Sequence, residues 1–373
     1  MEQFLRQLQT IPEAAELIRR VEEGGCPAAV SGLQPVQRAC VGAAVAAACG
    51  RPAVFLCGDE REVQVLSADL ETLTGRRPVT LLGREWQFRP GAVGSRDWER
   101  SRLAALYALA QGDAPVVVAT ADGLMARTLP PETLRSLAIT LEVGGQAELG
   151  ALAEQLLSAG YTRCEQVEGV GQFALRGGIL DVFSPLMDQP VRCEFFDDEI
   201  DSMGAFDPGT QRRTRNVSSA RILPAAEVLP HCAPGGLPGL ADQLTALAEK
   251  LAKKQKTEAI VQTLREDAER LRSGAAPGAA DRYLAAIYPT VTAGVHYLPP
   301  DAVVFLSESG RVDERVKNTV LQQKQDVEAL LSAGVLAGEY AHLTLTAEEL
   351  YAALEDFPVI LEDSLPTSRH PLR

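Results

Sequence analysis

Short apolar segments alternate with helix-periodic segments through the first third of the chain, and this alternation limits the folds open to it. The predicted strands are residues 28–30, 53–57, 79–82 and 116–120. The predicted helices are residues 4–8, 12–21, 35–49, 60–73 and 101–110. Strands that alternate with helices of this length are joined by crossovers and run parallel. The sequence therefore predicts an α/β fold with a doubly wound parallel sheet.

The pattern changes near Leu129, Pro130 and Pro131. One predicted helix, residues 147–157, precedes a series of close-set strands. These predicted strands are residues 164–167, 172–175, 179–183, 191–196 and 200–206. Gly177 and Gly178 separate two of them, where a tight hairpin turn favours residues that accept positive φ. This part predicts a small α+β unit with an antiparallel sheet.

Helical character returns after about residue 223. We expect one long amphipathic helix over residues 241–271, and a strand over residues 303–306. Two further helices and a last strand are predicted at residues 314–333, 347–354 and 359–361. The tail, residues 364–373, is polar, carries two prolines and has no evident partner element.

The net charge of -14, from 36 Lys and Arg against 50 Asp and Glu, disfavours non-specific nucleic-acid binding by the whole surface. The first residues lack the pattern of a signal peptide, and the longest apolar run, residues 39–49, is about half of a bilayer span. We therefore expect a cytoplasmic protein without a membrane partner. Seven scattered cysteines without a C-x-x-C pair, and four dispersed histidines, predict buried thiols and no metal site.

The turn after the first predicted strand is where a parallel α/β domain binds phosphate. A working phosphate loop would need Gly in place of Gln37, Lys in place of Arg38, and Ser or Thr in place of Ala39. Pro35 also removes a donor amide after Gly32. The first 249 residues contain no lysine at all. We therefore predict a degenerate phosphate turn and no nucleotide cofactor.

The acidic half of such a site would follow the strand at residues 303–306. This strand ends in Ser307 and Glu308, and a lone Glu without a preceding Asp is a poor magnesium site and an ordinary surface residue. No Ser/His/Asp, Cys/His or G-x-S-x-G arrangement can be assembled either. The sequence predicts no catalytic residues and no enzyme.

Two charged clusters are weaker candidates. The acidic cluster at residues 197–201 could attract a cation, but such a cluster is more typical of a solvated turn. The lysines of residues 250–256 could meet nucleic acid, but their neighbours Glu249 and Glu258 favour a mixed-charge helix face.

The antiparallel unit carries a different signal. Arg192, Glu194 and Phe196 share one face of a predicted strand, because side chains alternate with period two. Arg176 ends a neighbouring strand. Arginines beside an aromatic residue are favoured at protein interfaces. The alternative, which the sequence leaves open, is that Arg192 merely pairs with Glu194 or Asp197.

These residues lie in a recognisable segment. It contains G-Q-F-A-L-R-G-G-I-L-D-V-F-S-P from Gly171, and V-R-C-E-F-F-D-D-E-I-D-S-M-G-A-F-D-P-G-T-Q-R ending at Arg212. Residues 116–125, 222–227 and 297–301 are further landmarks in the same order. The chain closely resembles the UvrB-homology region of bacterial transcription-repair coupling factors (Mfd).

The resemblance implies a UvrB-like architecture, in which a degenerate helicase-like (RecA-like) domain is interrupted by a small domain that docks the repair ATPase UvrA. The domain would comprise residues 1–126 and 222–363, the UvrA-binding insert residues 127–221, and the linker tail residues 364–373. The family differs from UvrB in having lost this nucleotide site, which agrees with the degenerate turn. The aromatic hairpin with which UvrB grips damaged DNA would also be missing, because residues 83–100 are few and contain no tyrosine.

The resemblance places the UvrA contact at Arg176, Arg192 and Phe196. It further implies that the RNA-polymerase-binding module and the ATP-driven, magnesium-dependent DNA translocase motor of the family are absent from this chain, which we expect to be an N-terminal fragment. In the whole protein, C-terminal domains would mask the UvrA-binding surface. We therefore expect an adaptor for transcription-coupled nucleotide excision repair; the alternative is a UvrB-like nucleotide- and DNA-binding half-helicase.

Overall fold

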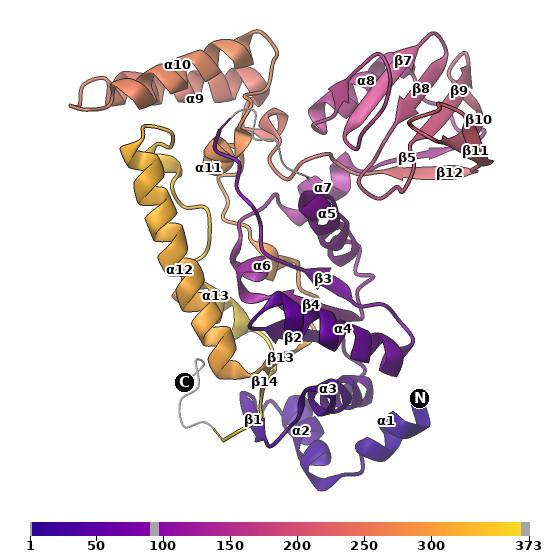
Figure 1. Cartoon of the computed structure of the whole chain (residues 1–373), viewed down its shortest axis with the longest axis vertical. Coiled ribbons are helices and arrows are strands. Elements are labelled where there is room, and N and C mark those ends of the chain that lie inside the picture. The colour runs from indigo at the N-terminus through magenta and orange to yellow at the C-terminus, as the bar shows by residue number, and fades with distance from the viewer. Residues whose placement is uncertain (1, 90–96, 367–373) are drawn as a thin grey trace.

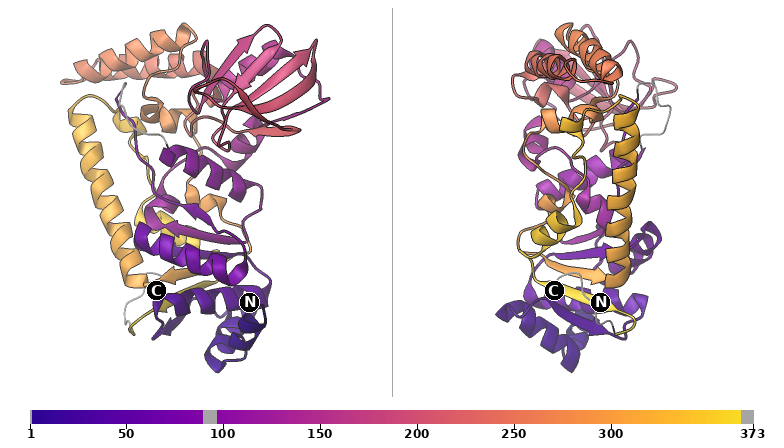
Figure 2. Two further views of the ribbon diagram at one scale, coloured as in Figure 1. Left: turned by 45° about the vertical axis from the view of Figure 1, so that its right-hand side comes forward. Right: turned by 90° about the vertical axis from the view of Figure 1, so that its left-hand side faces the viewer.

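The computed structural model describes residues 2–89 and 97–366. A parallel sheet with helices on both faces occupies one end of the molecule, and an antiparallel sheet and a helical hairpin occupy the other (Figure 1). In both views of Figure 2 the antiparallel sheet and the helical hairpin lie at the same end of the molecule. The predicted α/β class with a smaller antiparallel unit is confirmed.

The parallel sheet has six strands. In spatial order they are β1 (Ala28–Ser31), β14 (Val359–Asp363), β13 (Val303–Ser307), β2 (Ala53–Cys57), β4 (Val116–Thr120) and β3 (Val79–Leu81). Every neighbouring pair is parallel. The four inner strands β14, β13, β2 and β4 are buried along their whole length. Strands of this kind appear in the sequence as largely apolar runs.

Alternate strand residues face two separate cores. The helices that line the first core are α1 (Glu2–Leu8), α2 (Pro12–Glu23), α3 (Pro35–Cys49) and α4 (Glu60–Thr74). The opposite core receives α5 (Asp97–Ala110), α6 (Ala121–Met125), α7 (Pro131–Leu137), α9 (Gly236–Leu251), α10 (Glu258–Arg272), α11 (Leu284–Ile287), α12 (Ser309–Ser332) and α13 (Ala347–Leu354). Helices on both faces confirm the doubly wound arrangement.

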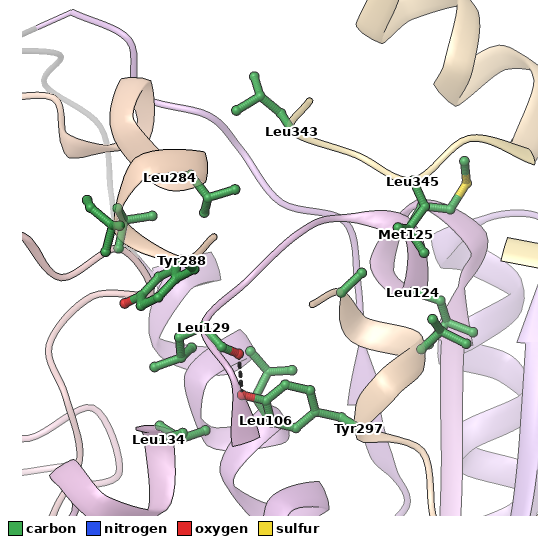
Figure 3. Close-up of a cluster of buried hydrophobic side chains, with 14 of the residues drawn as sticks. Leu106, Leu124, Met125, Leu129, Leu134, Leu284, Tyr288, Tyr297, Leu343 and Leu345 are labelled. Atoms are coloured by element: carbon green, nitrogen blue, oxygen red, sulfur yellow. Dashed lines mark hydrogen bonds between the residues drawn. The ribbon is translucent and has the colours of Figure 1, made fainter. Parts of the chain in front are cut away.

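The second core joins segments that are far apart in the chain. Figure 3 shows Leu124 and Met125 of α6 in the same apolar cluster as Tyr297, with Leu345 next to Met125. The Tyr297 hydroxyl donates a hydrogen bond of 2.8 Å to the carbonyl of Leu129. Residues on either side of the antiparallel unit thus share one core.

The antiparallel unit begins and ends with a two-stranded ribbon, β5 (Ile139–Glu142) paired with β12 (Ser219–Ile222). Its six-stranded sheet has the order β11 (Arg213–Asn216), β10 (Glu199–Phe206), β9 (Val191–Phe196), β8 (Ile179–Val182), β7 (Gln172–Arg176) and β6 (Thr162–Arg163). Only the β6–β7 pair is parallel. Helix α8 (Leu149–Ser158) packs on one face, against residues such as Leu180 and Cys193. The other face carries a smaller apolar cluster that contains Ala174, Phe183 and Phe206.

Two predicted elements are wrong. The strand predicted at residues 164–167 is displaced, because the residues that pair with β7 are Thr162 and Arg163. The single helix predicted at residues 241–271 is two helices, α9 and α10, which pack as a hairpin. The turn between them contains Lys256 at a φ of 60°, and the Thr257 hydroxyl donates to the carbonyls of Leu251 and Lys254.

The segment at residues 83–100, predicted to be too short for an aromatic hairpin, is described in part. Residues 83–89 form neither helix nor strand, residues 90–96 lie outside the described part of the chain, and α5 begins at Asp97. Most of the predicted tail, residues 367–373, also lies outside it. In the described ranges, no helix has both the length and the apolar composition to cross a membrane.

Candidate functional site

The degenerate phosphate turn lies where β1 leads into α3, and α3 holds it against the sheet. Gly42 allows the close approach, since a Cβ there would lie 2.5 Å from the Phe55 ring. Gly32 adopts a φ of 89°, a conformation that strains other residues. At the start of α3 the backbone N–H of Gln34 donates a hydrogen bond of 2.8 Å to the side-chain oxygen Oε1 of Gln37. At least one backbone N–H group at this turn is thus already hydrogen-bonded within the chain and is not available to a phosphate.

Arg38 occupies the centre of this site, at the first turns of α3. Its guanidinium forms an ion pair with Glu308 after β13, and a second with Glu62 of α4 at 3.3 Å. Glu62 also accepts a hydrogen bond of 2.7 Å from the Ser307 hydroxyl. The fold therefore brings the predicted residues Arg38, Ser307 and Glu308 together. The expectation that Glu308 is an ordinary surface residue is wrong, because it is half-buried against Arg38.

A second carboxylate is buried beside this group. Glu362 of β14 is paired in register with Ser307, and its side chain is fully buried. Neither of its carboxylate oxygens has a hydrogen-bond partner among the described residues. Burial raises the pKa of Glu362 well above its ordinary value, the Arg38 charge lowers it, and the Asp363 charge raises it again. The site thus concentrates acidic groups around one guanidinium.

This arrangement suits an internal ion-pair cluster rather than a phosphate cradle. A bound phosphate would have to displace Glu308 from Arg38 and would meet the negative charge of Glu62. Ala39 is completely buried and offers no hydroxyl for a magnesium ion. Among the described residues there is also no cluster of three His, Cys, Asp or Glu side chains suited to a metal.

The second candidate is the outer face of the antiparallel sheet. Strand register places Arg192 of β9 directly opposite Asp181 of β8, and Glu194 opposite Ile179. Arg176 of β7 is opposite Ile179 in turn. The predicted common face of Arg192, Glu194 and Phe196 is confirmed, since Val191 and Cys193 point to the core between α8 and the sheet. The β7–β8 hairpin turns at Gly177, with a φ of 59°, as predicted.

Asp181 links the two arginines. Arg192 donates from Nε to Asp181 Oδ1 at 2.7 Å and from Nη2 to Oδ2 at 2.8 Å. Arg176 Nη2 donates to the same Oδ2 at 2.8 Å. The hydrogen bonds from Arg192 to Asp181 raise the pKa of Arg192 above its ordinary value. The side chains of Arg176 and Arg192 are 52% and 22% exposed, whereas that of Asp181 is buried.

Phe196 ends this face and is 75% exposed, an unusual state for a phenylalanine. It precedes the β9–β10 turn, where Asp197 adopts a φ of 52°. The alternative prediction, in which Arg192 pairs with Glu194 or Asp197, is wrong, because the carboxylate that pairs with Arg192 is that of Asp181. Glu194 instead accepts a hydrogen bond of 2.7 Å from Ser202.

Sequence reasoning missed three residues of this face. Asp181 was detectable, because it is a carboxylate inside an apolar run and period two places it on the side of the arginines. Gln211 approaches Arg192 at 3.4 Å. Arg213 of β11 lies across Gly204, where a Cβ would clash with Arg213 Nε at 1.9 Å, and its guanidinium donates to the Ser202 hydroxyl at 3.4 Å. No sequence pattern pointed to the last two.

The two charged clusters lie elsewhere. The acidic cluster is the exposed β9–β10 turn and the start of β10. Its residues are Asp197, Asp198, Glu199 and Asp201. Lys250 belongs to α9 and pairs with Glu339 at 3.1 Å, but the other lysines are in the turn after α9, so the predicted mixed-charge helix face is wrong. All seven cysteines are free thiols, two of them buried.

Comparison with known proteins gives this geometry a context. Residues 139–227, which span the antiparallel unit, match the family model described as the UvrB interaction domain. The chain is 29% identical over 322 residues to the transcription-repair-coupling factor of Bacillus subtilis, which covers 85% of this chain. The chain resembles the transcription-repair coupling factors. The resemblance predicted from the sequence is thus confirmed.

Two further coupling factors agree. That of Myxococcus xanthus is 35% identical over 65% of this chain, and that of Escherichia coli is 34% identical over 47%. The chain spans 27%, 20% and 15% of the lengths of these three relatives. The match to the UvrB interaction domain, set beside the parallel sheet, fits a UvrB-like arrangement.

Proposed function

We propose that this chain is an adaptor that recruits UvrA through the outer face of its antiparallel sheet. The observation that carries the proposal is Phe196, 75% exposed on the same sheet face as the Asp181-linked arginines, within the residues that match the UvrB interaction domain. An exposed aromatic ring on one face with arginines is a composition favoured at binding hot spots. Arg176, Arg192 and Phe196 are its proposed anchors.

The adaptor role places this chain in transcription-coupled nucleotide excision repair, where UvrA is brought to a stalled RNA polymerase. RNA polymerase and DNA would be bound by other parts of a coupling factor, because this chain spans 27% or less of the relatives compared above. ATP and magnesium would serve the translocase motor in those parts. The C-terminal domains of a whole coupling factor would mask the UvrA-binding face.

The adaptor needs no nucleotide, and the Arg38 cluster supports this. Arg38 is neutralised by Glu308 and Glu62, so a triphosphate would bind only by breaking two ion pairs. The alternative is a UvrB-like half-helicase that binds nucleotide and DNA. Isothermal titration with Mg-ATP separates the two proposals: saturable binding in the low micromolar range would favour the half-helicase.

Surface plasmon resonance on immobilised UvrA tests the adaptor role. The chain should bind saturably and dissociate reversibly, and it should bind more tightly than a full-length coupling factor in which the face is masked. A matched control is the chain with Phe196→Ala and Arg176→Ala together, checked for folding by circular dichroism. Failure of the unaltered chain to bind UvrA would refute the proposed function.

A further inference from the structure

Asp181 is a charged residue in an otherwise apolar strand. It lies between Leu180 and Val182, both buried, and its own side chain is almost completely covered. Burial of an isolated carboxylate at such a position would be strongly unfavourable, because the charge would lose its hydration. The carboxylate is stabilised there by three hydrogen bonds from Arg176 and Arg192, which connect β7, β8 and β9 across the outer face.

We propose that Asp181 is the positioning residue of the UvrA-binding face, an inference that rests on the proposed function. Asp181 contacts no partner itself. It holds the guanidinium groups of Arg176 and Arg192 in one fixed orientation, so that the partner meets ordered arginines on the face that also carries Phe196.

The hydrogen-bond donors divide between the two arginines. Arg192 uses Nε and Nη2 on Asp181, and its guanidinium lies 4.7 Å from the centre of the Phe206 ring. Its Nη1 and Nη2 also donate to the backbone oxygen and Oε1 of Gln211 at 3.5 and 3.4 Å, so most of its donors are engaged within the chain. Arg176 uses Nη2 on Asp181, and its Nε and Nη1 have no hydrogen-bond partner among the described residues. Arg176 thus presents more free donors to a partner than Arg192 does, although both side chains are partly exposed.

This division specifies the chemistry of the partner surface. The free donors of Arg176 suit a carboxylate, which a guanidinium binds through two parallel hydrogen bonds. The exposed ring of Phe196 requires an apolar recess. We therefore infer that the UvrA surface carries an acidic residue next to an apolar recess.

Fixing the arginines before binding raises affinity. Ordering a long side chain at an interface costs roughly a factor of two to ten in affinity. The carboxylate of Asp181 orders both arginine side chains when the chain folds, so that this conformational entropy is not lost again on binding. Loss of its charge should therefore weaken UvrA binding by about tenfold or more, without removing any group that touches UvrA.

The test is Asp181→Asn, which keeps the size of the side chain and removes its charge. In surface plasmon resonance this variant should bind UvrA about tenfold more weakly than the unaltered chain. In a chain that already carries Arg176→Ala and Arg192→Ala, the same substitution should cause no further loss. Asp267→Asn is the matched control, because Asp267 of α10 forms a buried ion pair with Arg282 at 2.8 Å in another part of the chain. It should lower thermal stability and leave UvrA binding unchanged.

The order of the arginines is measured separately by NMR. The Nε–H signal of Arg192 should exchange slowly with water in the unaltered chain and should disappear into fast exchange in Asp181→Asn. Fast exchange in the unaltered chain would overturn the positioning role without reference to UvrA.

The binding outcomes separate the two proposals. Unchanged affinity in Asp181→Asn would refute the positioning role while leaving the proposed function intact. Higher affinity would also refute it, because Asp181 would then compete with the partner for the arginines. If the unaltered chain does not bind UvrA, the proposed function is refuted. The positioning role of Asp181 for UvrA is then refuted as well.

Discussion

Substitution of Arg38 by alanine should destabilise the parallel-sheet part of the chain. The side chain of Arg38 is only 5% exposed, and its guanidinium is shared by Glu308 and Glu62. Alanine removes the positive charge and leaves both carboxylates facing the vacated space. Glu362, buried nearby, loses the one charge that lowers its pKa.

The size of the effect follows from the burial of the partners. Removing one partner of a buried ion pair costs about 3 to 5 kcal/mol. Glu308 is 20% exposed, so water entering the vacated space can solvate part of its charge. We therefore expect a loss of about 2 to 4 kcal/mol in the free energy of unfolding. Adding Glu308→Gln should recover part of this loss, because it removes one of the two uncompensated charges.

Urea denaturation followed by tryptophan fluorescence is the assay. The chain's two tryptophans are Trp86 and Trp98, and Trp86 packs against the second core of the parallel sheet, so fluorescence reports on this part. The matched control is Arg311→Ala, which breaks an ion pair between Arg311 and Asp59 at the same edge of the sheet. Arg311 is 55% exposed, so its loss should cost less than about 1 kcal/mol. Equal stability of the Arg38 and Arg311 variants would refute the view that Arg38 closes the site.

Two further predictions concern pH and DNA. Because burial raises the pKa of Glu362 above its ordinary value of 4.5, the folded chain retains a proton that the unfolded chain releases, and this contribution to stability is lost as pH rises from about 4.5 through the raised pKa. Glu362→Gln should therefore have the same melting temperature as the parent near pH 4.5 and a higher melting temperature than the parent at neutral pH. An equal difference in melting temperature between variant and parent at both pH values would contradict this. The chain should also bind duplex DNA weakly at physiological salt, because its charge of -14 opposes counterion release. A tight gel shift that weakens steeply with salt would show a basic face.

The parallel sheet was predictable because its central strands are buried on both faces. Buried parallel strands appear as continuous apolar runs, and the helices between them carry their own boundary signals. Helix α3 begins at Pro35 and ends before Gly50, which has a φ of 63°. At these positions local sequence and tertiary structure favour the same conformation.

The helical hairpin was not predictable from periodicity. Buried residues continue at helical spacing through both helices, with Leu244 and Leu251 in α9 and Leu264 in α10. No Gly or Pro marks the turn, and its left-handed residue is Lys256. Packing of α9 against α10 decides the break, and packing is a tertiary effect.

The face that we propose as the UvrA-binding surface was predictable in part from strand alternation, but its internal connections were not. Strand alternation placed Arg192, Glu194 and Phe196 on one side, as the structure has them. The partner of Arg192 depends on the register between β8 and β9, which places Asp181 opposite Arg192. Register depends on the hairpin turns and on burial, so a pairing with Glu194 or Asp197 was equally open from the sequence.

Alanine substitution at the three proposed anchors tests the central claim most directly. Arg176→Ala, Arg192→Ala and Phe196→Ala are compared by surface plasmon resonance on UvrA, with Phe4→Ala, an exposed phenylalanine of α1, as the matched control. Loss of a true anchor should cost about 2 kcal/mol, or roughly thirtyfold in affinity, and the control should bind as the parent does. If all three variants are folded by circular dichroism and retain the parental affinity, UvrA does not bind this face.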